Sequence, residues 1–177
     1  MIGIRDDALH LTPTGILFAG RRLPCVIGRG GIRDAKREGD MATPSGRHRI
    51  LGLLYRPDRL RAGALPRWAE PIGPRDLWCD DPDHPDYNHP VRAPFRASHE
   101  RLRRADPMYD LILVTDWNYP DARPGQGSAI FVHTWRRPGY PTAGCLAFSR
   151  EDLLWIAARV TIGTEIVVPP APGIFVP

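Results

Sequence analysis

The chain has 177 residues, a formal net charge of +4 and 42% hydrophobic residues, a composition typical of a globular protein and not of a disordered or fibrous one. This length favours one domain over residues 1–177, with its core at about 8–168 and a Pro-rich tail at 169–177. No apolar run of about 18 residues is present, which excludes a transmembrane helix, and we expect no integral membrane association.

The predicted elements are mostly short strands, because 20 Pro and 17 Gly interrupt the chain. Buried or alternating apolar stretches predict strands, the first three as an antiparallel meander, at 8–12, 15–18, 22–28, 49–55, 109–115, 128–133 and 164–168. Loops are expected at 29–48 and 56–96. We expect a short helix at 97–104 and another that begins at Ser149, with Asp152 in an approximate capping box.

Arginine dominates the basic residues, since Lys36 is the only lysine among the 24. Arginine binds carboxylates and phosphates with two parallel hydrogen bonds, which raises nucleic acid as a partner. The 20 acidic residues are interspersed, however, and neither a basic helix nor an aromatic RNA-binding motif is present. We therefore predict no nucleic-acid partner, and a solvated surface is the simpler account of the arginines.

The cysteines and the first residues bear on the cellular compartment. Cys25, Cys79 and Cys145 cannot form a disulfide framework, and their spacing contains no paired metal-binding motif. Residues 1–7 lack the charged segment and apolar stretch of a secretory signal peptide. We expect a cytoplasmic protein, or a periplasmic one if the N-terminus has been trimmed.

His133 and Cys145 carry the strongest chemical signal. The apolar strand before His133 should present it at an exposed end, and the tight turn 142–144 should bring Cys145 beside it. A cysteine is only a few per cent thiolate at neutral pH, but a nearby histidine can take its proton and hold the thiolate by charge. The N–H groups of Gly144 and Cys145 could hold an oxyanion. A core histidine and an unrelated buried cysteine are the alternative.

This arrangement resembles the L,D-transpeptidase catalytic-domain family, also called YkuD-like. His133 matches the family's histidine at a strand end, and Thr-Ala-Gly-Cys at 142–145 matches its Ser/Thr-x-Gly-Cys motif. Thr-Pro-Ser-Gly at 43–46 matches an upstream Thr-Pro-x-Gly segment, and the resemblance covers nearly the whole chain. Ala143 and Ala147 depart from the pattern, where many members have His and Arg or Asn, so the chain resembles a divergent branch.

The resemblance implies a mainly β fold, a β-sandwich or flattened barrel with one or two short helices. It also implies a cysteine acyl-enzyme without cofactor or metal. Cys145 would attack the carbonyl of the diamino acid in a peptidoglycan tetrapeptide stem or soluble muropeptide and release D-Ala, with His133 as base and then acid. Without an export signal, L,D-carboxypeptidase action in cytoplasmic murein recycling is expected. The alternatives are a periplasmic L,D-transpeptidase, which forms 3–3 cross-links or exchanges D-amino acids, and a non-catalytic murein-binding module.

Substrate contacts are predicted from two segments near this motif. The stem peptide carries several carboxylates, and the cationic side chains of the loop 29–40 could bind them: Arg29, Arg33, Lys36 and Arg37. Pairing with acidic residues of the same loop is the alternative. Tyr140, Thr142 and Ala143 precede the cysteine and are expected as walls of the cleft.

The stretch 79–89 holds four Asp and two His, which raises a metal site. It matches neither the EF-hand pattern nor a His-Glu-x-x-His helix. We therefore predict a lid or rim of the substrate cleft there, and no metal.

Overall fold

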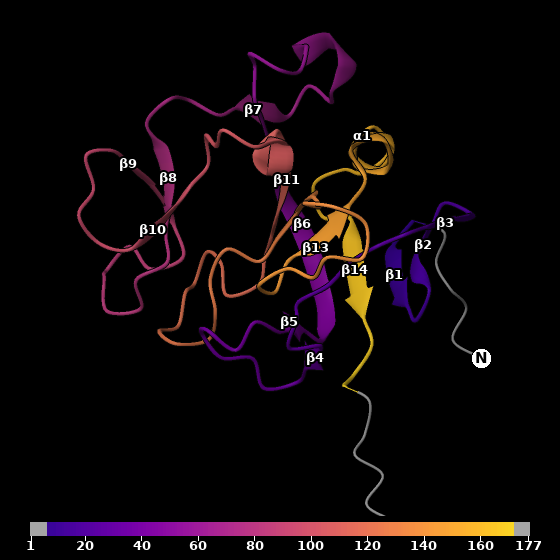
Figure 1. Ribbon diagram of the computed structural model, residues 1–177, viewed down its shortest axis with the longest axis horizontal. Helices are drawn as coiled ribbons and strands as arrows, with labels where there is room; N and C mark the ends of the chain where they lie inside the picture. Colours follow the sequence, from indigo (N-terminus) through magenta and orange to yellow (C-terminus); the bar gives the residue numbers. More distant parts are fainter. Residues whose placement is uncertain (1–6, 172–177) are drawn as a thin grey trace, which may run out of the picture.

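The computed structural model describes residues 7–171, and its main element is a sheet of nine strands (Figure 1). Eight of them follow in the order β13-β12-β11-β6-β14-β1-β2-β3, and β7 pairs with β6. The strands are β1 (Leu9–Thr12), β2 (Gly15–Phe18), β3 (Arg21–Leu23), β6 (Gly46–Tyr55), β7 (Ala69–Pro71), β11 (Leu111–Thr115), β12 (Phe131–Thr134), β13 (Leu146–Phe148) and β14 (Glu165–Val168). Six of the seven residues used to predict the compartment, 1–6, and the end of the Pro-rich tail, 172–177, lie outside the described part.

The long strand β6 joins the two halves of the sheet, since its beginning pairs with β14 and its end with β11, both antiparallel. The meander of β1, β2 and β3 has the predicted antiparallel pairing. After β3 the chain crosses to the opposite edge, where Val26 and Ala147 exchange two backbone hydrogen bonds of 2.9 Å. Gly28 forms a further bridge with Thr142. These contacts nearly close the sheet into a barrel, which confirms the predicted fold class.

The helix α1 (Arg150–Ala157) covers one face of the sheet. As predicted, Ser149 caps it, accepting a hydrogen bond of 3.0 Å from the N–H of Asp152. The helix buries Leu153, Ile156 and Ala157 completely in a core that includes residues of β1, β2, β6, β11 and β14. Burial of this apolar face is the main reason that so short a helix is stable.

The strand β11 is buried on both faces, because alternate residues enter two different cores. Leu111 and Leu113 belong to the core under α1. Ile112 and Val114 belong to a second core, which also contains Cys145. The predicted buried strand at 109–115 therefore separates the helix from the face that carries the nucleophile.

A three-stranded sheet forms a lobe beside the large sheet, at the left of Figure 1. Its strands are β8 (Asp76–Cys79), β9 (Pro90–Arg92) and β10 (His99–Arg101). The helix predicted at 97–104 is wrong, because this segment pairs antiparallel with β8, with His99 opposite Cys79. A partner strand distant in sequence provides hydrogen bonds that local propensity does not reveal.

The remaining segments refine the predicted boundaries. The loop 29–48 contains a short parallel pair, β4 (Ile32–Arg33) and β5 (Thr43–Pro44), and 3-10 turns occur at η1 (Ala62–Ala64) and η2 (Pro107–Tyr109). The strand predicted at 128–133 begins only at Phe131, because Gly127 and Ala129 have φ values of +95° and +50°, outside the extended region.

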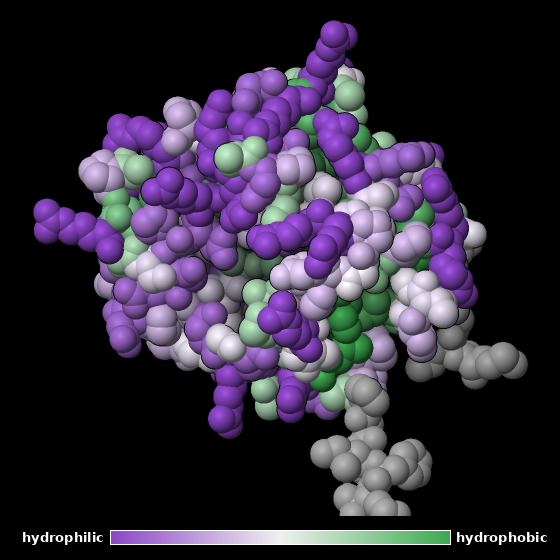
Figure 2. All heavy atoms as spheres, viewed as in Figure 1, coloured by the Kyte–Doolittle hydropathy of each residue, from purple (hydrophilic) through white to green (hydrophobic). Residues whose placement is uncertain are grey.

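The molecular surface in Figure 2 is mostly hydrophilic, with one hydrophobic strip near the end of β14. Over the described residues 7–171, no helix is both long enough and apolar enough to cross a membrane.

Candidate active site

Cys145 lies in a tight turn immediately before β13 and is 8% exposed. Gly144 has a φ of +141°, and a Cβ there would lie 2.8 Å from the Ala42 carbonyl oxygen and 3.0 Å from Ile130 Cδ1. Only glycine fits such a conformation and such close neighbours without strain. The glycine of the motif is therefore a steric requirement for seating the cysteine.

Two threonine hydroxyls hold this turn. Thr142 Oγ1 donates to the Cys145 carbonyl at 2.6 Å and accepts from the Gly144 N–H at 3.1 Å. Thr43 Oγ1 donates to the Gly144 carbonyl at 2.7 Å and accepts from the Gly28 N–H at 2.9 Å. The upstream Thr-Pro-Ser-Gly segment thus holds the turn before Cys145 by direct hydrogen bonds, although the two segments are about a hundred residues apart in the sequence.

The Gly144 N–H was predicted to hold an oxyanion. In the resting structure it donates to Thr142 Oγ1 instead, so it is engaged before any substrate binds. The Cys145 N–H remains the predicted donor.

His133 lies inside β12, between Ile112 of β11 and Ala147 of β13, and is 2% exposed. The prediction that it ends a strand in an exposed position is therefore wrong, because pairing on both sides buries it. Its Nδ1 lies 2.8 Å from the Thr134 carbonyl oxygen. A carbonyl only accepts, so Nδ1 carries the proton and Nε2 is left as the acceptor. This carbonyl is the partner that the sequence could not identify.

Cys145 and His133 line the same cavity, which has a volume of about 230 Å³. Cys145 Sγ donates to the Ala129 carbonyl at 3.1 Å and accepts from the Phe131 N–H at 3.4 Å. The ring of Tyr109 contacts the His133 ring edge to face, with centroids 5.2 Å apart. The nucleophile and the base predicted from the motif are thus brought together in one enclosed site.

Burial controls the charge of this pair. It raises the pKa of the Cys145 thiol to about 12 and lowers the pKa of His133 to about 4. The resting pair at neutral pH is therefore a thiol and a neutral imidazole, not the thiolate and imidazolium expected from the sequence. A neutral thiol and a neutral imidazole are the forms needed if Nε2 takes the thiol proton during attack.

The loop 29–40 reaches the cavity through Glu38, but its predicted cationic side chains do not line it. Arg33 and Arg37 are exposed and outside the residues that line the cavity, and Arg29 contributes its backbone N–H to the Thr142 carbonyl at 2.9 Å. The side chain of Lys36 is only 2% exposed and pairs with Asp40 at 2.6 Å. Lys36 is therefore a buried structural cation, and the alternative of pairing within the loop is the one observed for it.

Of the three predicted cleft residues before Cys145, two line the cavity and one does not. Thr142 and Ala143 line the cavity. Tyr140 lies outside it and packs under two guanidinium groups, those of Arg136 and Arg137, at 5.6 and 4.8 Å from the ring centroid.

Charged residues that the sequence did not single out complete the cavity wall: Glu38, Asp80, Glu100, Arg104 and Arg136. Burial raises the pKa of Glu100, and the charge of Asp80 raises it further. One oxygen of Asp80, Oδ1, is buried without a hydrogen-bond partner. No local pattern marks these residues, except that Asp80 belongs to the stretch predicted as a rim. Within the described residues, no group of three potential ligands could hold a metal ion.

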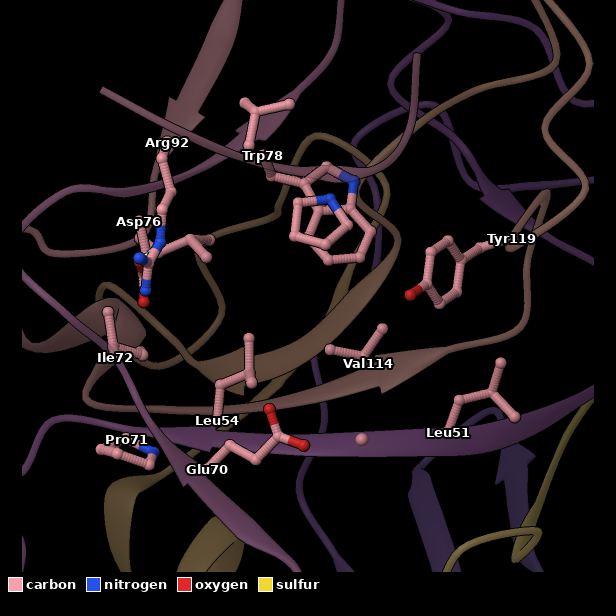
Figure 3. Close-up of a pocket in the computed structure, with 14 residues that line it drawn as sticks. Leu51, Leu54, Glu70, Pro71, Ile72, Asp76, Trp78, Arg92, Val114 and Tyr119 are labelled. Atoms are coloured by element: carbon pink, nitrogen blue, oxygen red, sulfur yellow. Dashed lines mark ion pairs between the residues drawn. The ribbon is translucent and has the colours of Figure 1, made fainter. Parts of the chain in front are cut away.

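A larger cavity of about 450 Å³ lies between the lobe and the large sheet (Figure 3). Trp78 and Tyr119 face Leu51, Leu54 and Val114 across it, and an ion pair between Asp76 and Arg92 lies at its edge. Neither His133 nor Cys145 lines it. The candidate nucleophile and base therefore line the smaller cavity and not the larger one.

The family model described as the L,D-transpeptidase catalytic domain matches residues 10–168. The chain therefore belongs to this family, as its motifs predicted, and is a cysteine enzyme of the L,D-transpeptidase type that acts on peptidoglycan. Comparison with curated proteins and with solved structures gives no match.

Proposed function

We propose that this enzyme releases the terminal D-Ala of peptidoglycan tetrapeptide stems through an acyl-enzyme on Cys145, as an L,D-carboxypeptidase. The observation that carries the proposal is the shared cavity of Cys145 and His133, with Nδ1 of the imidazole fixed on the Thr134 carbonyl. That hydrogen bond leaves Nε2 free to take a proton, which is what a neutral thiol needs from its base.

In the proposed reaction, Sγ attacks the carbonyl of the diamino acid's L-centre while Nε2 takes the thiol proton. The bond to D-Ala breaks, its nitrogen leaves with that proton, and a thioester to Cys145 remains. Water then attacks the thioester with His133 again as base, which returns the thiol and a tripeptide. The Cys145 N–H would stabilise the oxyanion in both halves.

The charges around the cavity support a stem peptide as the substrate. Arg136 is suited to a carboxylate of the stem, because guanidinium binds carboxylate with two hydrogen bonds. Arg104 adds positive charge to the cavity wall, but it already holds Asp106 with hydrogen bonds of 2.9 and 2.7 Å. Glu38, Asp80 and Glu100 are suited to the free amino group of a diamino acid. The buried, unpartnered oxygen of Asp80 supports such a donor in particular.

Water is the proposed acceptor, and an added D-amino acid would compete with it for the thioester. A role in murein recycling would place the reaction in the cytoplasm. Fractionation of cells that express the native gene tests the compartment, and recovery from the periplasm would favour cross-linking instead.

The test is mass spectrometry of disaccharide-tetrapeptide incubated with the enzyme, with and without added D-amino acid, and with Cys145→Ala as control. We expect loss of D-Ala alone, absent in the variant. Dimers or D-amino-acid exchange products would replace the carboxypeptidase proposal with transpeptidation. No change with folded protein would overturn the catalytic proposal for this substrate and leave a murein-binding module.

A further inference from the structure

Asn88 lies in the lobe, just before β9, and is 1% exposed. Its Oδ1 accepts hydrogen bonds from Trp78 Nε1 at 2.8 Å and from the backbone N–H of Ala129 at 2.9 Å. Its Nδ2 donates to the carbonyls of Trp117 at 3.2 Å and Asn118 at 2.6 Å. A primary amide has two donors and two acceptor positions, so this buried side chain is fully used.

Ala129 connects this amide to the nucleophile. Its N–H binds Asn88, and its carbonyl accepts the hydrogen bond from Cys145 Sγ at 3.1 Å. Its φ of +50° is unfavourable for a residue with a Cβ and persists only where neighbours hold it. The two polar groups of one strained residue thus link the lobe to the sulfur.

The same segment provides a second contact to the sulfur, since the N–H of Phe131 donates to Sγ at 3.4 Å. Residues 129–131 therefore offer an acceptor for the thiol proton and a donor to the sulfur. A shift of this segment would displace the nucleophile, and a misplacement of 1 Å can cost about a hundredfold in rate.

We propose that Asn88 is a positioning residue for Cys145, which it places through the backbone of Ala129. The Ala129 carbonyl holds the thiol proton in the resting enzyme, and the S–H bond must turn toward His133 Nε2 for attack. The inference rests on the proposed function only in taking Cys145 as the nucleophile.

The test compares Asn88→Ala with Asn118→Ala. Asn118 is a matched control, because both asparagines have a positive φ, +57° at Asn88 and +49° at Asn118. The Asn118 side-chain amide donates to the carbonyls of Arg123 and Gly127 and does not bind Ala129. In Asn88→Ala we expect D-Ala release to fall by about 10- to 100-fold in kcat, with KM within about twofold. We expect iodoacetamide to modify Cys145 about tenfold faster at pH 8, because a hydrogen bond that favours the neutral thiol is lost. In Asn118→Ala both rates should stay within about threefold of the wild type, because the Asn118 group that Asn88 binds is the backbone carbonyl, which this substitution keeps.

Cys25 and Cys79 serve as internal references when the modified protein is digested and its peptides are quantified by mass spectrometry. General loosening of the fold would speed their modification as well. Ala129→Gly is the second variant, because glycine adopts a φ of +50° without strain and should fold normally. It should shift both rates in the same directions, by roughly three- to tenfold, through added backbone freedom.

Wild-type rates of both reactions in folded Asn88→Ala would overturn the proposal. So would a change shared equally by Cys25, Cys79 and Cys145. If Asn88→Ala does not fold, Ala129→Gly decides by the same criteria. If the wild-type enzyme leaves the tetrapeptide intact, the proposed function fails, and the modification rates of Cys145 still decide the role of Asn88.

Discussion

The large sheet and the lobe contribute to the same cavity in different ways. The sheet supplies His133 from an interior strand and Cys145 from a turn held by backbone and threonine contacts. The lobe supplies Asp80 and Glu100, whose positions depend on a sheet of only three short strands. Backbone pairing thus fixes His133 and the turn of Cys145, whereas the lobe contributes charged side chains, which we propose select the substrate.

The largest expected effect comes from removing the Cys145 thiol, the proposed nucleophile that the large sheet holds in place. Cys145→Ala should lower D-Ala release by at least about a thousandfold, because Cys145 is the only thiol among the described residues that line the cavity, and the hydroxyls of Ser128 and Thr142 there are weaker nucleophiles. Liquid chromatography with mass spectrometry measures it. Cys25→Ala, which replaces a half-buried cysteine outside the cavity, should retain activity; equal losses in both would contradict the assignment.

Gly144→Ala tests the turn itself. The new Cβ would press on the Ala42 carbonyl at 2.8 Å and impose a φ of +141° on alanine, so unfolding free energy should fall by about 3 kcal/mol and activity by about a hundredfold. Gly139→Ala is the matched control, with a φ of +72° and open space around its Cβ position, and should cost about 1 kcal/mol. Urea unfolding compares them, and equal costs would exclude the steric role.

The depressed pKa of His133 makes stability depend on pH. Its pKa is lowered by burial from 6.5 to about 4, so between these values the unfolded chain binds more protons than the folded one. The contribution of His133 is present above pH 6.5 and is lost as pH falls toward 4, by about 2 kcal/mol between pH 7 and 5. Urea unfolding of the wild type and of His133→Gln at pH 7 and pH 5 checks this prediction. The loss of unfolding free energy between the two pH values should be smaller in the variant. An unchanged pH dependence would contradict it.

The smallest expected effects concern the charges around the cavity. Arg136→Ala and Glu100→Gln should each raise KM for the tetrapeptide about tenfold with a smaller change in kcat, because they remove binding contacts and leave the reacting pair intact. Arg33→Ala, an exposed arginine outside the cavity, should change KM less than twofold. Initial rates over a range of substrate concentration measure these values. An effect of Arg33→Ala as large as that of Arg136→Ala would restore the predicted role of the loop 29–40.

The sequence by itself determined the family and the mainly β fold, and it singled out the candidate pair His133 and Cys145, which the structure places in one cavity. These signals are local, because the Thr-Ala-Gly-Cys motif is a run of four residues and the strand patterns follow from alternating or buried apolar residues. The capping residue Ser149 was also evident from its spacing to Asp152.

Only the tertiary structure decided which charges face the nucleophile and in what state the pair rests. Glu100 reaches the cavity because the segment predicted as a helix pairs with β8, a contact that depends on residues distant in sequence. The neutral resting state of Cys145 and His133 follows from burial, which arises only when both cores are assembled. Local sequence patterns identify the candidate reacting residues, whereas their protonation states and charged neighbours depend on burial and strand pairing, which exist only in the folded chain.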